Sequence, residues 1–138
     1  MEWTKQLSIG NRTLDLEHKE LLHIINWMDH LIEVADPVTL SQAFELFEGK
    51  LQANFADEEK IAQAINIDFT DHKLTHQQLL MVFGQVKEGV WTTDGMPPKN
   101  EAKIHVSALK NKFIQHIMID GKPLKIVLDT CLYDFKPD

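Results

Sequence analysis

Four stretches of the chain carry apolar residues at spacings of three and four positions, the spacing that places side chains on one face of a helix. The helices predicted from this pattern cover residues 13–34, 39–65, 70–90 and 100–119. The breaks between them are short and contain turn-forming residues such as Asp36-Pro37. Because short loops force long neighbouring helices to run antiparallel, the sequence predicts an all-α, up-down-up-down antiparallel four-helix bundle.

Both ends of the chain are expected to pack onto this bundle. An N-terminal arm containing Trp3 and Ile9 is predicted to lie along it, and a short C-terminal helix is predicted at residues 124–132. Thr39 or Ser41 is available to cap the second helix.

The pattern also predicts which residues of the fourth helix face inward. These are Ile104, Ala108, Leu109, Phe113, Ile117 and Ile119, and Gly121 with Pro123 is expected to end the helix.

Length and charge narrow the classes of protein. The 138 residues form one predicted domain, 1–138, and carry 14 Lys and Arg against 21 Asp and Glu, a net charge of −7. This balance disfavours nucleic acid and anionic membrane surfaces as partners, since both recruit clustered basic residues. With Cys131 as the lone cysteine and no run of apolar residues long enough for a membrane helix, we expect a cytoplasmic protein.

Polar residues interrupt each apolar seam. They are His18 in the first predicted helix, Asn54 and Glu58 in the second, His72 and His76 in the third, and His116 and Asp120 in the fourth. Three of these sets are i, i+4 pairs, which a helix places about 5 to 6 Å apart. Buried carboxylates and imidazoles are costly unless a partner satisfies them, and bound metal supplies the missing positive charge. Each residue taken singly is also compatible with an ordinary hydrogen-bonded core position.

The chain resembles the hemerythrin family, specifically its bacterial hemerythrin-like domains. The segments that carry the resemblance are Trp3, Leu14–Leu21 with Ile25-Asn26, Asn54–Glu59, His72–His76 and His116–Asp120. The resemblance implies a non-haem di-iron centre, held in that family by five histidines and two carboxylates, that binds O2 at one iron.

Carried over by position, the resemblance assigns the predicted ligands to two metal ions. It implies that one iron is held by His72, His76 and His116 and that His18 is a ligand of the other, with Glu58 and Asp120 bridging them. Imidazole and carboxylate ligands suit iron, although Zn or Mn also accept them, and a mononuclear site is an open alternative.

Two departures from the family pattern affect the second metal. Asn54 stands where the family has a histidine four residues before the bridging Glu58, so the second metal loses an imidazole. Asp120 follows His116 by four residues where the family usually uses five, a difference of about 100° around a helix that a π-bulge can recover.

Other polar residues are assigned to the surface. His23, His30 and His105 lie off the inward seams, and the run 57–60 is expected to be solvated except for Glu58. Asp15 is compatible with either an orienting role or a favourable charge at a helix N-terminus.

The preferred function is an iron- and O2-binding protein, a carrier, store or sensor rather than an enzyme, with a modified second metal site. Two alternatives stay open: an iron-dependent oxidase, peroxidase-like or NO-reacting protein, and a metal-free interaction bundle. The expected partner is O2 or a similar small diatomic ligand.

Overall fold

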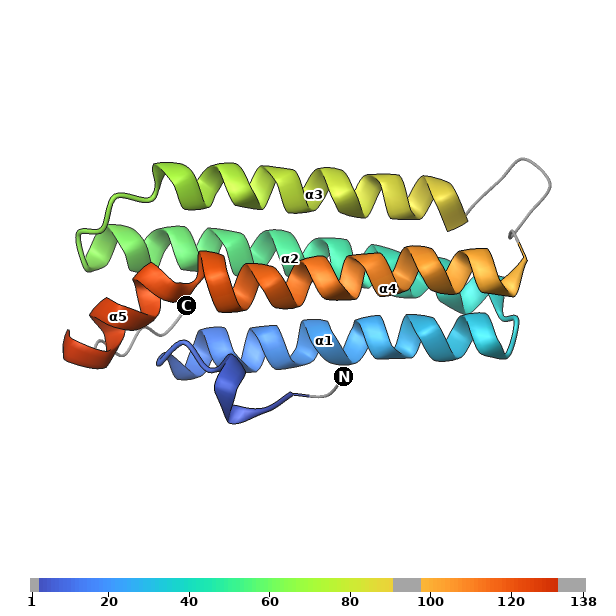
Figure 1. The fold of residues 1–138 in the computed structure, drawn as a ribbon, viewed down its shortest axis with the longest axis horizontal. Coiled ribbons are helices and arrows are strands. Elements are labelled where there is room, and N and C mark those ends of the chain that lie inside the picture. The colour runs from blue at the N-terminus through green and yellow to red at the C-terminus, as the bar shows by residue number, and fades with distance from the viewer. Residues whose placement is uncertain (1–2, 91–97, 132–138) are drawn as a thin grey trace.

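The computed structural model describes residues 3–90 and 98–131, and these are almost entirely helical (Figure 1). The elements are the 3-10 turn η1 (Lys5–Leu7), the helices α1 (Arg12–Glu33), α2 (Pro37–Ala64), α3 (Thr70–Val90) and α4 (Lys99–Gln115), the π-helical turn η2 (His116–Asp120) and the helix α5 (Lys122–Cys131). The predicted helix boundaries are therefore close to the observed ones, and residues 92–97 of the last predicted loop lie outside the described part.

The four long helices form the predicted antiparallel bundle. α1 contacts α2 and α4, and α3 contacts the same two helices, so each long helix has two neighbours. Figure 1 shows their directions alternating along the chain, with α5 extending beyond the end of α4. The all-α fold class is confirmed.

An asparagine and an aspartate cap the first two long helices. Asn11 Oδ1 accepts a hydrogen bond from Leu14 N at 3.0 Å at the start of α1, and Asp36 Oδ1 accepts one from Thr39 N at 3.1 Å at the start of α2. The expected caps Thr39 and Ser41 are wrong, because Pro37 occupies the first turn of α2 and places the capping position at Asp36.

The core is built around aromatic rings, with Phe47 stacked on Phe83 at 5.4 Å and edge-on to Phe113 at 6.2 Å. On α4 the buried positions are Ala102, Val106, Leu109 and Phe113. This face excludes Ile104, Ala108 and Ile119, which are exposed and correct the seam predicted for the fourth helix. Ile104 follows Ala102 by two positions, which turns it about 200° around the helix, away from the core.

The N-terminal arm packs as expected. Leu7 and Ile9 are buried and Trp3 is partly buried against the core. Asp15 fastens the arm to α1, since its carboxylate accepts hydrogen bonds from Ser8 Oγ at 2.5 Å and Ile9 N at 2.9 Å. Asp15 therefore holds the arm that covers one end of the bundle.

The last turn of the fourth bundle helix widens into η2, where Gly121 N donates to His116 O at 3.0 Å, five residues back. A side chain at Gly121 would meet Ile117 O at 2.6 Å, so glycine permits this close approach. α5 begins one residue later, and Gly121 therefore redirects the chain where a simple helix stop was predicted.

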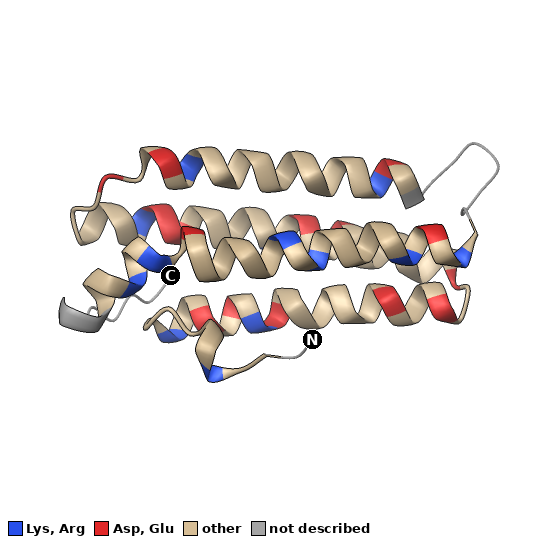
Figure 2. Cartoon of the chain, in the orientation of Figure 1, with Lys and Arg blue, Asp and Glu red and all other residues tan. Residues whose placement is uncertain are grey.

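Asp and Glu are interspersed among Lys and Arg along the helices (Figure 2). None of the described helices combines the length and the apolar character that a membrane span requires.

Candidate metal centre

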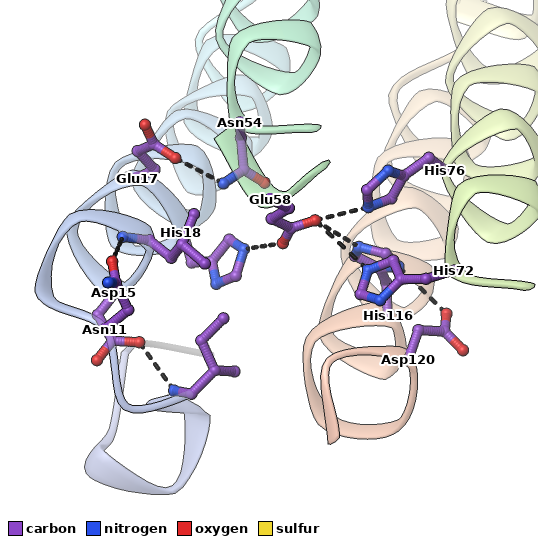
Figure 3. Close-up of polar contacts among 12 residues, drawn as sticks. Asn11, Asp15, Glu17, His18, Asn54, Glu58, His72, His76, His116 and Asp120 are labelled. Atoms are coloured by element: carbon purple, nitrogen blue, oxygen red, sulfur yellow. Dashed lines mark hydrogen bonds and ion pairs between the residues drawn. The ribbon is translucent and has the colours of Figure 1, made fainter. Parts of the chain in front are cut away.

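Glu58 of α2 lies at the centre of a buried cluster of histidines (Figure 3). Its Oε1 lies 3.0 Å from His18 Nε2 of α1, and its Oε2 lies 2.6 Å from His76 Nε2 of α3. His72 Nε2 and His116 Nε2 are 3.4 Å and 3.8 Å from the same Oε2. Histidines from three other elements thus converge on one carboxylate of α2 that is 1% exposed.

Three of the imidazoles form one half of the cluster. His72 and His76 come from successive turns of α3, and His116 comes from the start of η2. Ligand atoms of these histidines and Glu58 all lie within 4.8 Å of one another. The Nε2 atoms of His72 and His116 are buried and have no hydrogen-bond partner within the protein. This is expected of nitrogens that serve as metal ligands. We call this group, His72, His76 and His116, the three-histidine half.

The pKa shifts of Glu58 and His76 suit metal binding. Burial alone would raise the pKa of Glu58, but its contacts with His116, His18, His72 and His76 hold that pKa well below its usual value. Burial lowers the pKa of His76 despite the nearby carboxylate. An ionised carboxylate and a neutral imidazole are the forms that ligate divalent metals. The residues present therefore fit a transition metal.

Asp120 contacts the ring nitrogen of His116 that faces away from Glu58. Asp120 Oδ2 lies 3.2 Å from His116 Nδ1, on the far side of the ring from Glu58 (Figure 3). Burial opposes protonation of His116, but Glu58 and then Asp120 raise its pKa above the usual value. The widened turn η2 brings Asp120 within reach of His116. The carboxylate contacts Nδ1 of the ring, which is the position of a group that orients an imidazole ligand. The bridging role of Asp120 stays a prediction.

The other half of the cluster lies between α1 and α2 and carries His18, Asn54, Glu17 and Asp57; we call it the asparagine half. Asn54 is fully buried, and its Nδ2 donates to Glu17 Oε1 at 2.8 Å while its Oδ1 has no hydrogen-bond partner. His18 Nδ1 is likewise buried without a partner.

Two acidic residues of the asparagine half were missed by the sequence reasoning. Asp57 is buried, not solvated as predicted, because α2 packs against α1 at this level. Burial and a hydrogen bond with Asp57 raise the pKa of Glu17 to about 8. The available signal was spacing, since Asp57 follows Asn54 by three positions and so lies on nearly the same helix face.

Aromatic rings hold the three-histidine half in place. Phe55 stacks on His76 with ring centroids 3.7 Å apart, and Phe69 stacks on His72 at 4.3 Å. A pocket of about 240 Å³ lies outside His72, and Phe69, Thr75 and Asp120 are among the residues that line it. Flat apolar contacts of this kind restrict ring rotation and keep the ligand atoms turned inward.

The remaining histidines lie outside the cluster, in keeping with the predicted seams. His23 and His30 are exposed and His105 is half-buried.

Comparison with known protein families agrees with this geometry. Residues 9–120 match the family model for the hemerythrin HHE cation-binding domain. The chain belongs to the hemerythrin family. The matched range of this hemerythrin domain begins in the N-terminal arm and ends at Asp120, so it contains every residue of both halves of the cluster. No curated protein and no solved structure matches the chain.

Proposed function

We propose that this hemerythrin-like domain is a non-haem iron protein of the di-iron type that binds O2 or a similar diatomic ligand, with an altered second metal position. The observation that carries the proposal is the buried contact of Glu58 with imidazoles from three different elements, two of them with unpartnered Nε2 atoms. Buried polar atoms without partners are rare in folded proteins unless something absent from the protein chain satisfies them.

Different residues of the cluster have different roles in this proposal. His72, His76 and His116 would hold the first metal, and Glu58, which contacts these three and His18, would be shared with a second metal held by His18. Iron bound there would supply the electrons for binding a diatomic ligand. Phe55 and Phe113 pack against rings of the cluster and are buried, so bulk water is kept away from it.

Anaerobic reconstitution with Fe(II) tests this proposal. Metal is quantified per chain, and the visible spectrum is recorded before O2 is added, after it is added and after it is removed. We expect at least one tightly bound iron per chain and a visible absorption band that appears with O2 and disappears on its removal.

Three other outcomes separate the alternatives. Multiple turnover with peroxide or NO would replace the carrier by an oxidase, peroxidase-like or NO-reacting protein. Bound iron without any O2-dependent band would leave a metal site and remove the O2 function. A folded protein that retains no metal would make the chain an interaction bundle.

A further inference from the structure

The asparagine half contains a polar atom whose burial is otherwise unexplained. Asn54 is fully buried on α2, one turn before Glu58, and its Oδ1 has no hydrogen-bond partner. A buried carbonyl oxygen is normally hydrogen-bonded, so this atom calls for a partner that the protein chain does not supply.

Glu17 fixes the direction in which that oxygen points. The amide nitrogen of Asn54 donates to Glu17 Oε1 at 2.8 Å, which leaves the oxygen on the opposite side of the amide. Figure 3 shows the nitrogen turned toward Glu17 and the oxygen on the side where Glu58 lies. Glu17 is held in turn by a hydrogen bond with Asp57. A carboxyl oxygen that accepts from the amide nitrogen selects one of the two amide orientations, whether or not the carboxyl group is protonated.

The inward oxygen changes the chemistry of the second metal position. The atoms that would hold a metal there are His18 Nε2, which lies 3.0 Å from Glu58 Oε1, that Oε1 itself and the unpartnered Asn54 Oδ1, one nitrogen and two oxygens. The three-histidine half offers three imidazoles beside one carboxylate oxygen. Carboxylate and carbonyl ligands favour hard cations such as Mn²⁺, whereas imidazole ligands suit Zn²⁺ and Fe²⁺.

We propose that Glu17 is a positioning residue that turns Asn54 Oδ1 inward and thereby creates an oxygen-rich second metal position selective for a hard divalent cation such as Mn²⁺. This inference rests on the proposed metal-binding function of the cluster. It makes the centre a site for two different metals, with the borderline metal in the three-histidine half and the hard one in the asparagine half.

The experiment loads the two positions in sequence. Metal-free protein first receives one equivalent of Zn²⁺, and Mn²⁺ is then titrated while the signal of free Mn²⁺ is followed by electron paramagnetic resonance. We expect one Mn²⁺ to bind per chain with the Zn²⁺ retained. Glu17→Ala should weaken Mn²⁺ binding about 10- to 100-fold, the usual effect of removing a group that orients a ligand. Asn54→Leu should abolish it.

Three further variants distinguish positioning from charge. Glu17→Gln cannot ionise but keeps an oxygen that accepts from the amide, so it should bind Mn²⁺ nearly as well as the parent protein. Glu17→Ala placed in the Asn54→Leu background should have no further effect. Glu20→Ala, on the same helix but exposed and paired with Lys50 at 2.7 Å, is the matched control and should leave binding unchanged.

The contradicting results are distinct from those that would defeat the proposed function. Equal losses in Glu17→Ala and Glu17→Gln would show that an ionisable carboxyl group matters and the accepted hydrogen bond does not, and unchanged Mn²⁺ affinity in Glu17→Ala would overturn the positioning role. Binding of Zn²⁺ with no Mn²⁺ uptake would overturn the second position while the first stands. Absence of Zn²⁺ binding would instead defeat the proposed metal function.

Discussion

The two halves of the cluster share Glu58 but are built by different means. The three-histidine half places His72, His76 and His116 around one carboxylate oxygen and stacks Phe55 and Phe69 on two of the rings. The asparagine half has one imidazole and an amide whose nitrogen is bound to a carboxylate. The first half is a set of ligands held by apolar packing, whereas the second depends on a chain of hydrogen bonds. The two sides of one buried carboxylate are therefore lined by different sets of side chains, and the proposed difference in metal preference rests on that contrast.

Removing Glu58 breaks both halves at once and has the largest expected effect. Glu58→Ala leaves four buried imidazoles without their shared partner, and loss of one member of a buried polar pair costs about 3 to 5 kcal/mol. Urea unfolding of the metal-free variant measures this loss, and metal analysis should find neither position occupied. The control is Glu59→Ala, whose half-buried carboxylate pairs with Lys73 at 3.3 Å and should cost about 1 kcal/mol or less. Similar losses in the two variants would mean that Glu58 has no special place in the fold.

Replacing Asn54 by histidine tests why the asparagine half is expected to bind iron less tightly than the three-histidine half. Asn54→His should raise tightly bound iron from about one toward two per chain, because an imidazole replaces a neutral amide oxygen as ligand. Metal content after dialysis measures this change. Ala53→His adds a histidine at the neighbouring exposed position and should leave the content at that of the parent protein. An unchanged iron content in Asn54→His would show that Asn54 does not limit the second position.

A smaller effect is expected for a variant of Asp120, and it distinguishes a residue that orients His116 from one that bridges two metal ions. The structure places its carboxylate on Nδ1 of His116, so Asp120→Asn should weaken metal in the three-histidine half about 10-fold and leave the asparagine half unchanged. Competition with a chelator measures the two affinities. Equal weakening at both positions would instead favour the bridging role implied by family resemblance.

The last effect concerns the metal-free protein and its pH dependence. The pKa of Glu17 is about 8 in the folded chain against an ordinary value of 4.5, so the unfolded chain ionises Glu17 first as the pH rises. Glu17 therefore lowers the free energy of unfolding progressively between about pH 4.5 and 8. Glu17→Gln should gain stability relative to the parent protein at pH 8 but not at pH 4. Urea unfolding at both values measures the difference, and a gain that is the same at both would contradict the assignment.

Much of the fold was predictable because helical periodicity depends on local spacing alone. The four long helices, the packed arm and the inward placement of His18, Glu58 and the three-histidine half follow from the spacing of apolar and polar residues. The error on α4 arose because isoleucine and alanine occur on more than one face of this helix. Ile104 therefore resembles a core residue, whereas Val106 is the buried residue in this turn.

The asparagine half was harder to predict because its properties come from contacts between helices. Glu17 lies on α1 and Asn54 on α2, 37 positions apart, and a sequence does not show that they meet. The burial of Asp57 depends on the same packing. A widened turn at η2 was foreseen as a way for Asp120 to approach its partner, but the nitrogen of His116 that it contacts depends on the ring's orientation.

The central claim is that the buried histidines around Glu58 hold metal. Crystals grown with Fe(II) under anaerobic conditions and measured at the iron absorption edge test it most directly. The account predicts a strong anomalous peak bonded to the Nε2 atoms of His72, His76 and His116 and a weaker peak beside His18 and Asn54. Anomalous peaks confined to surface carboxylates, with none among the three histidines, would contradict it.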